Sequence, residues 1–177
     1  MSVIATIVEG HGEVEAIPVL IRRLRPDAIC PRPVRVKRQR VLMPGELERH
    51  ARIADAGIVD RGGLGGVLLV LDADNACAAT DGPILTGRLR AALPHRPVAC
   101  CLAVREFESW LLAGLDSQPE ATDEARGGKA ALIRALGEYA PTVDQPKCAA
   151  RMDIDRASAL SRSFRHFAEA VVRLASN

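Results

Sequence analysis

The chain has 177 residues, of which 48% are hydrophobic and 26% are charged, as expected for a globular protein that buries a core of its own. This length fits one domain, or one domain with a small extension. The formal net charge of +2 excludes an argument for nucleic-acid binding from overall charge alone. No apolar run approaches the roughly 20 residues of a membrane-spanning helix, so we expect no membrane contact.

The cysteines of the chain bear on its cellular location. The five cysteines are odd in number and form no CxxC pair, and the four histidines are scattered, so a zinc site has little support. The first residues have the pattern of a strand, with no leader segment before them. We therefore expect ordinary reduced thiols and a cytoplasmic location.

The first part of the chain alternates strand patterns with helical ones. Residues 3–8 are a β-branched apolar run and predict a buried strand, and the apolar stripe of residues 13–24 predicts a helix after it. Residues 34–42 place Val and Leu between Arg and Lys and predict a second strand. A helix is expected from Pro44 to about residue 58, because proline is tolerated at a helix start.

The middle of the chain continues this alternation. Residues 67–71 follow a glycine-rich loop and form the clearest buried strand of the sequence. Helices are expected over residues 83–93 and 105–115, and a fourth strand over residues 97–104. Strands that alternate with helices predict an α/β fold with a mostly parallel central sheet of about four strands, flanked by helices on both faces.

The pattern changes after residue 115. The next residues are polar and contain Gly and Pro, and everything beyond them predicts helices, over residues 129–139, 146–152 and 161–174. We expect residues 1–115 to form the α/β core. Residues 116–177 would form a helical C-terminal extension packed on it, in a single compact unit.

Residues 32–40 carry five Lys or Arg side chains in nine positions. The favoured interpretation is a strand with a solvated basic face. The alternative is a contact surface for a nucleic-acid phosphate backbone beside an active site.

Acidic side chains follow three of the predicted strands. Glu9 comes after the first, Asp72 and Asp74 after the third, and Glu106 and Glu108 after the fourth. Ligands of an open parallel sheet bind at the carboxyl ends of its strands, so these acids are expected to converge. Converging carboxylates repel unless a cation lies between them, and Mg²⁺ or Mn²⁺ prefers oxygen ligands.

We therefore predict a metal site formed by Glu9, Asp72 and Asp74. The alternative is that Asp72 and Asp74 only cap a turn and that Glu9 is a surface acid. Gly10 and Gly12 allow a tight turn under Glu9 and leave space for a phosphate, towards which the next helix points its N-terminus.

With these residues in place, the chain resembles the Toprim fold, whose members include topoisomerases, primases and the nuclease domains of OLD-type proteins. The family pattern is a Glu after the first strand and a DxD after a later one, matched here by Glu9, Asp72 and Asp74. Nearly the whole chain is similar to a bacterial Toprim-like family of the DUF4276 type. The matching segments are residues 8–13, 71–74, 105–113, 141–147 and 161–165.

The resemblance implies Mg²⁺-dependent phosphodiester chemistry. Asp72 and Asp74 would hold the metal, and Glu9 would join them or act as a general acid or base. Glu13 stands where OLD-type relatives have a second acid. Either Glu106 or Glu108 would complete the metal shell, and Glu106 is favoured because it is nearer the strand end.

Three further consequences follow from the resemblance. Arg105 and Lys147 would contact a phosphate oxygen of the substrate. Asn75 replaces an acid that relatives often carry after the DxD, so a second metal ion is less secure. Small Toprim-like proteins often depend on a separate ATPase, and this chain has no GxxxxGK[ST] loop, so we expect a nuclease that acts on nucleic acid with a separate ATPase subunit.

Other functions stay open at this stage. One is a non-catalytic regulatory or scaffold subunit that keeps the fold. Another is a phospho-receiver-like domain in which Asp72 is phosphorylated. A dinucleotide site is the weakest option, because the glycine pattern at Gly10 and Gly12 lacks its third glycine.

Overall fold

A computed structural model describes residues 1–74, 77–115 and 127–176 of the chain. Within them, four parallel strands form one sheet in the order β2-β1-β3-β4. The strands are β1 (Val3–Val8), β2 (Val34–Arg35), β3 (Gly65–Asp72) and β4 (Val98–Ala103).

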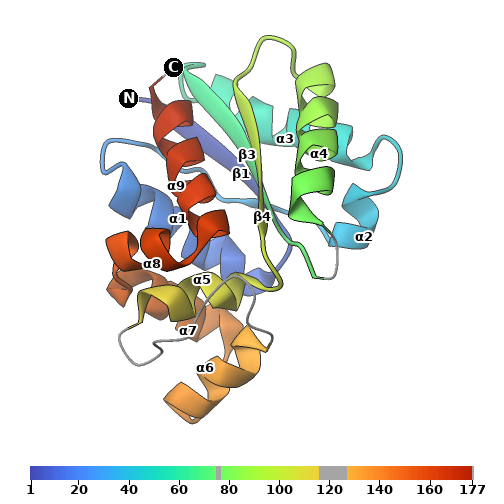
Figure 1. Cartoon of the computed structure of the whole chain (residues 1–177). Helices are drawn as coiled ribbons and strands as arrows, with labels where there is room; N and C mark the ends of the chain where they lie inside the picture. Colours follow the sequence, from blue (N-terminus) through green and yellow to red (C-terminus); the bar gives the residue numbers. More distant parts are fainter. Residues whose placement is uncertain (75–76, 116–126, 177) are drawn as a thin grey trace.

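Helices cover both faces of the sheet (Figure 1). On one face lie α1 (His11–Leu24) and α9 (Arg162–Ala175), and on the other lie α3 (Glu46–Val59) and α4 (Ala78–Ala92). Alternate residues of β3 enter opposite cores, with Val70 in the first and Leu71 in the second. This double burial explains the all-apolar strand sequence.

The remaining helices are α2 (Arg38–Val41), α5 (Phe107–Gly114), α6 (Gly128–Leu136), α7 (Pro141–Arg151) and α8 (Ile154–Leu160). Figure 1 shows α5, α6 and α7 beyond the end of the sheet at which its strands finish. Trp110 of α5 is fully buried against the rings of Phe107, Phe164 and Phe167.

The predicted α/β architecture with a four-stranded parallel sheet is confirmed, but the second strand is shorter than predicted. Only Val34 and Arg35 pair with β1, although the N–H of Val36 still donates to the oxygen of Val8. The chain then turns into the short helix α2, which buries Val41 and withdraws residues 38–41 from the sheet. The Val alternation was a true strand signal, but it ended after three residues.

Helix boundaries also differ from the predictions. Helix α4 begins five residues before Pro83, which lies inside it, and α7 begins at Pro141 and contains Pro146. Helix α8 was not predicted, although the side chain of Asp153 caps it by accepting from the N–H of Arg156, as expected of a cap residue. Among the described residues, no helix is long and apolar enough to cross a membrane.

Candidate functional site

The carboxyl ends of β1 and β3 mark the place where the strand order changes direction. Strand β2 lies beyond β1, and β4 lies beyond β3, so the connections that leave the two central strands turn to opposite sides. Such a point forms the ligand crevice of open parallel sheets. Glu9 directly follows β1, and Asp72 is the last residue of β3, so both predicted acids lie at this point of the sheet.

The turn between β1 and α1 is held by Glu13. Its side chain is only 4% exposed, and its Oε2 accepts from the backbone N–H of Glu9 at 3.0 Å. Glu13 is the third residue of α1, so its carboxylate satisfies backbone donors that the helix start leaves open. A Cβ at Gly10 would lie 2.8 Å from Glu13 Oε1, so a larger residue there would displace the Glu13 carboxylate from this position.

The space beside Gly12 is occupied by α7. A Cβ at Gly12 would lie 2.2 Å from Gln145 Oε1 and 2.6 Å from the backbone oxygen of Pro141. Gly12 therefore allows two helices to approach closely. The predicted phosphate contacts of Gly10 and Gly12 stay predictions.

Asp72 is bound at both its side chain and its main chain. Its Oδ1 accepts from the backbone N–H of Phe107 at 2.7 Å, at the start of α5. Its main-chain oxygen accepts from Nη1 of Arg38, whose Nη2 lies 3.5 Å from Asp81 Oδ2. Arg38 belongs to the predicted basic segment, and its side chain is only 13% exposed, so this residue is not part of a solvated face.

Asp74 and Arg105 face each other in unusual backbone conformations. Their φ angles are 52° and 68°, and they are the only non-glycine residues with positive φ among those described. The N–H of Asp74 donates to the oxygen of Arg105 at 3.0 Å, and Arg105 Nη1 donates back to the oxygen of Asp74 at 3.4 Å. Such strain often occurs at functional sites. Asn75 lies outside the described residues.

The two acids that follow β4 have different surroundings. Glu106 lies at the N-cap of α5, and its Oε2 accepts from the backbone N–H of Lys129 at 2.9 Å. Glu108 is buried, and its Oε1 accepts from the Tyr139 hydroxyl at 2.9 Å and from Gln145 Nε2 at 3.1 Å. The charge of Glu108 acts on both Asp72 and Glu13, whereas the carboxyl group of Glu106 binds the start of α6 through Lys129.

The gathered carboxyl groups raise one another's pKa values. Burial, followed by the charges of Glu13 and Glu108, raises the pKa of Asp72 to about 9. Burial also raises the pKa of Glu13 to about 7, against the lowering effect of its backbone hydrogen bonds. The pKa of Glu9 is raised as well, mainly by burial, and the charge of Asp74 adds to the effect. We call Glu9, Glu13, Asp72 and Glu108 the acidic cluster.

The donor set of the acidic cluster consists of oxygens only, as Mg²⁺ prefers. Glu9 Oε2 is buried and has no hydrogen-bond partner among the described residues. Across residues 1–74, 77–115 and 127–176, however, no three His, Cys, Asp or Glu side chains are arranged as ligands of one metal ion. An ion held by these side chains as they stand would have at most two of them as ligands and would keep several waters.

Lys147 does not lie beside the acidic cluster. It is an exposed residue of α7, with Nζ 3.6 Å from Asp144 Oδ1. It lines a cavity of about 350 Å³ together with Leu115, Leu136 and Arg151, and no member of the acidic cluster lines that cavity. The structure thus places Arg105, but not Lys147, beside a predicted metal ligand.

The sequence assigned no role at this site to Tyr139 and Gln145. It favoured Glu106 over Glu108, and a solvated basic face over a contact surface for the segment that includes Arg38. The sequence signal for Arg38 was the basic segment, and Gln145 lies in a segment that the Toprim resemblance includes. Tyr139 had no signal, because only the packing of α7 against α1 and α5 brings it to Glu108.

Comparison of the chain with protein-family models, with curated proteins and with solved structures gives no match.

Proposed function

We propose that the carboxyl ends of β1 and β3 bind Mg²⁺ or Mn²⁺ and support phosphodiester chemistry on nucleic acid, as part of a nuclease with a Toprim-like core. The observation that carries this proposal is the acidic cluster itself. Four carboxyl groups from three separate segments gather at one end of the sheet, Glu13 and Glu108 buried and Glu9 and Asp72 partly buried, and burial and mutual repulsion raise the pKa of Asp72 to about 9. Structures keep such an unfavourable arrangement mainly where it serves a function.

A divalent cation fits the residues present. Glu9 and Asp72 would hold the ion, because they lie at the carboxyl ends of the two neighbouring central strands and Glu9 offers a buried oxygen without a partner among the described residues. Asp74 is exposed, and as the side chains stand it does not form a three-ligand set with Glu9 and Asp72, so it would contact the ion through a water molecule. When bound, the ion would polarise a phosphate and lower the pKa of a water molecule.

The other residues would keep this arrangement in place. Glu13 fixes the turn that carries Glu9, and Phe107 orients the Asp72 carboxyl through its backbone N–H. Arg105 lies beside Asp74 and would meet a phosphate oxygen of the substrate. Arg38 offsets part of the negative charge.

The substrate and the partner rest on the Toprim resemblance. Nucleic acid is proposed as the substrate, and a separate ATPase subunit as the partner, because the chain carries no ATP-binding loop of its own. All five cysteines are free thiols, as a cytoplasmic protein would have them.

Calorimetry tests the metal site directly. We expect Mg²⁺ and Mn²⁺ to bind the protein at pH 7.5 with release of protons, seen as a heat that depends on the buffer's ionisation enthalpy. Asp72→Asn and Glu9→Gln should weaken binding at least tenfold. Asp60→Asn, which changes an exposed acid at the end of α3, should leave it unchanged. Equal binding by Asp72→Asn would refute the site.

Cleavage of single- and double-stranded oligonucleotides with Mn²⁺ then tests the chemistry. Wild-type protein should cleave and Asp72→Asn should not, with EDTA as a further control. If the wild-type protein binds the metal and cleaves neither substrate, phosphodiester chemistry at this site is refuted for the isolated chain.

A second candidate is a non-catalytic regulatory or scaffold subunit. The observation that favours it is that protein groups already satisfy several of the acids: Phe107 donates to Asp72, and Tyr139 and Gln145 donate to Glu108. It predicts that oligonucleotide binding, measured by fluorescence anisotropy, is the same with EDTA and with Mg²⁺. A metal requirement for binding would exclude it.

A further inference from the structure

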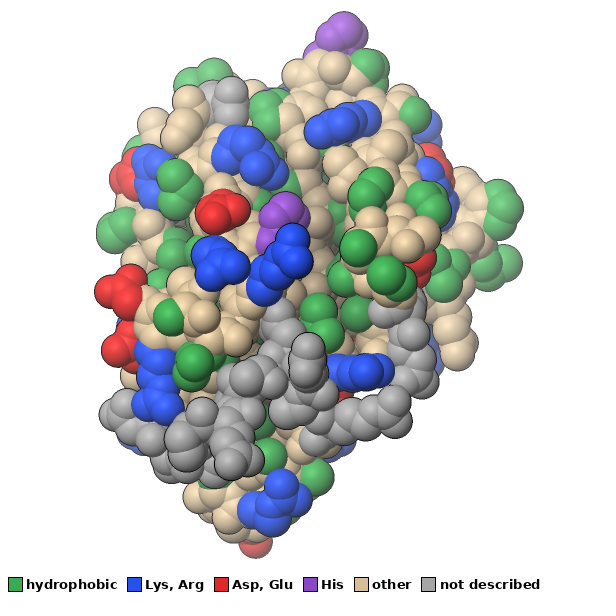
Figure 2. Space-filling view, in the orientation of Figure 1, with side chains coloured by type: hydrophobic (Ala, Val, Ile, Leu, Met, Phe, Trp, Pro, Cys, Tyr) green, Lys and Arg blue, Asp and Glu red, His purple; other side chains and the backbone are tan. Residues whose placement is uncertain are grey.

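The turn between α2 and α3 exposes large apolar side chains. Leu42 is 51% exposed and Met43 is 56% exposed, and Pro44 after them is also exposed. Ile84 of the neighbouring helix α4 is 59% exposed. Figure 2 shows hydrophobic side chains gathered over the lower part of α4 and the region of α2 beside it.

Ile84 lies on the side of α4 that faces this turn. Asp81, one turn before Ile84, pairs with Arg38 of α2, and Arg88, one turn after it, binds the carbonyl oxygens of Val41 and Met43. Residues three and four apart share a helix face, so Ile84 stands between these two contacts. We call Leu42, Met43 and Ile84 the apolar surface.

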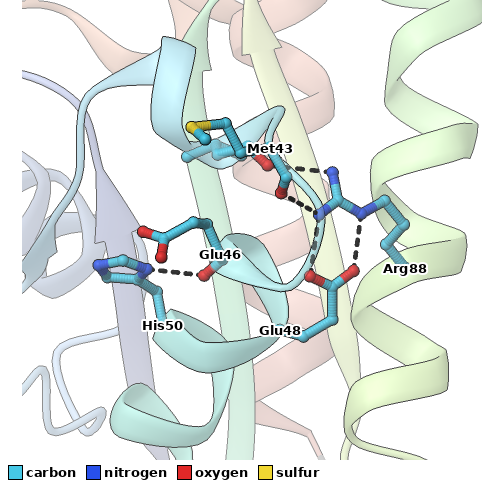
Figure 3. A network of polar contacts seen from close by, with 6 residues as sticks. Met43, Glu46, Glu48, His50 and Arg88 are labelled. Carbon is cyan, nitrogen blue, oxygen red and sulfur yellow. Dashed lines mark hydrogen bonds and ion pairs between the residues drawn. The ribbon is translucent and has the colours of Figure 1, made fainter.

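A single guanidinium holds the turn. Arg88 donates from Nη1 to the oxygen of Val41 at 3.0 Å and from Nη2 to the oxygen of Met43 at 3.1 Å. Its Nε and Nη2 also bind the two carboxylate oxygens of Glu48 at 2.7 and 2.9 Å. Figure 3 shows Arg88 between Met43 and Glu48, with the thioether of Met43 pointing away from the guanidinium. The apolar side chains are therefore presented on a fixed backbone, which lowers the entropy cost of binding.

The charges around the apolar surface are unbalanced. Its three nearby acids are each paired with an arginine: Glu46 with Arg40, Glu48 with Arg88, and Asp81 with Arg38. Lys37 before α2 and Arg49 in α3 are exposed and have no ion pair within the described part of the chain. The exposed charges that are not paired within the described chain are therefore positive, and a binding partner would meet them.

We propose that the apolar surface is a docking site for a segment of another protein that carries large apolar side chains flanked by Asp or Glu. Apolar contact would supply most of the binding energy, and the acids would meet Lys37 and Arg49. A second copy of this chain is the poorer occupant, because a symmetric contact would place the cationic residues of both copies against each other. The proposal does not depend on the metal site.

The extent of the surface indicates a short segment. Three large side chains and a proline are fewer than the residues of a standard interface between folded domains, and suit a peptide held by two or three apolar anchors. We therefore expect micromolar affinity.

Selection from a random peptide library tests the proposal. A phage-displayed library would be selected on the full-length protein after depletion on the variant Leu42→Ser/Met43→Ser. Both side chains are exposed, so the variant should keep the wild-type circular dichroism spectrum and melting temperature. Enriched peptides should carry an excess of Asp and Glu next to large apolar residues, and fluorescence anisotropy should show at least tenfold weaker binding to the variant.

Two further variants sharpen the test. Val59→Ser/Leu64→Ser removes an equally exposed apolar pair, 58% and 63% exposed, from the other end of α3, and should bind as wild type does. Arg88→Lys keeps the positive charge but loses the paired contacts with Glu48 and the turn, so peptide binding should fall.

Four outcomes would overturn the proposal: failure to enrich any peptide, enrichment of basic peptides, equal binding by Leu42→Ser/Met43→Ser, and equal loss of binding in the Val59 and Leu64 variant. Sedimentation velocity gives a fifth. A dimer of the wild-type protein that the Leu42 and Met43 substitutions abolish would identify a second copy as the occupant.

Discussion

The surroundings of a carboxyl group shift its pKa upward in the acidic cluster and downward in the Arg88 contacts. Burial and neighbouring acids raise the pKa of Asp72 to about 9, whereas hydrogen bonds from Arg88 lower the pKa of Glu48. Glu48 has a cation as its partner and ties two helices and a turn together. The acidic cluster has more carboxyl groups than cations. Glu48 therefore has a structural role. The acidic cluster lacks positive charge, which a bound cation would supply.

We expect the largest change in the free energy of unfolding from a glycine substitution beside the acidic cluster, and a much smaller one from a glycine substitution in α4. Gly12→Ala would force a Cβ against Gln145 and the backbone of Pro141, and should lower the free energy of unfolding by about 3 kcal/mol. Gly82→Ala in α4 meets nothing within 4 Å and should raise it by about 0.5 kcal/mol. Urea unfolding followed by circular dichroism measures both. Equal effects would mean that α1 and α7 are not closely packed at the acidic cluster.

Asp72→Asn should stabilise the metal-free protein. The pKa of Asp72 is about 9 in the folded protein and about 3.8 when unfolded, so the folded state binds an extra proton between these pH values. The stability that this carboxyl contributes is full below pH 3.8 and is lost as pH rises towards 9. The variant should therefore exceed wild type by about 2 kcal/mol at pH 8 and match it near pH 4.

Urea unfolding of both proteins at pH 4, 6 and 8 measures this difference. Saturating Mg²⁺ should reduce it at pH 8 by stabilising wild type alone. A difference that does not change with pH would show that Asp72 ionises normally and that neither burial nor the neighbouring acids disfavour its charge.

Arg88→Ala should lower the free energy of unfolding, whereas Asp72→Asn should raise it. The lowered pKa of Glu48 means that its contribution to stability is present above its unfolded value near 4.5 and is lost as pH falls below it. We expect a loss of about 1.5 kcal/mol at pH 7 that becomes smaller at pH 3, since the pair is partly exposed. Urea unfolding at the two pH values is the measurement. A loss that is equal at both would assign the effect to the Val41 and Met43 contacts.

The sequence predicted the parallel sheet and the place of Glu9 and Asp72, because an apolar run that ends on an acid reports both burial and the strand end. It did not predict Arg38 beside Asp72. The Val and Arg alternation of residues 34–42 suggested one strand, while the chain turns into α2 after Val36. The partners Tyr139 and Gln145 depend on helix packing between distant segments, which no local pattern records.

The choice between Glu106 and Glu108 shows another limit of sequence reasoning. Nearness to the strand end favoured Glu106, but helix α5 begins at Phe107, and the direction of a side chain depends on its position in that first turn. Glu106 stands at the N-cap position, where its side chain makes no bond to the helix and accepts instead from Lys129, while Glu108 turns towards Tyr139 and Gln145. Only the observed helix start separates the two.

The smallest expected effect follows from this difference. Glu108→Gln keeps an oxygen that accepts from Tyr139 and removes one charge that raises the pKa of Asp72, so it should stabilise the metal-free protein by about 0.5 kcal/mol at pH 8. The pKa of Asp72, followed by carboxyl-carbon NMR, should fall from about 9. Glu106→Gln should leave that pKa unchanged. If Glu106→Gln lowers the pKa and Glu108→Gln does not, the acid that completes the cluster is the one nearer the strand end, as the sequence alone suggested.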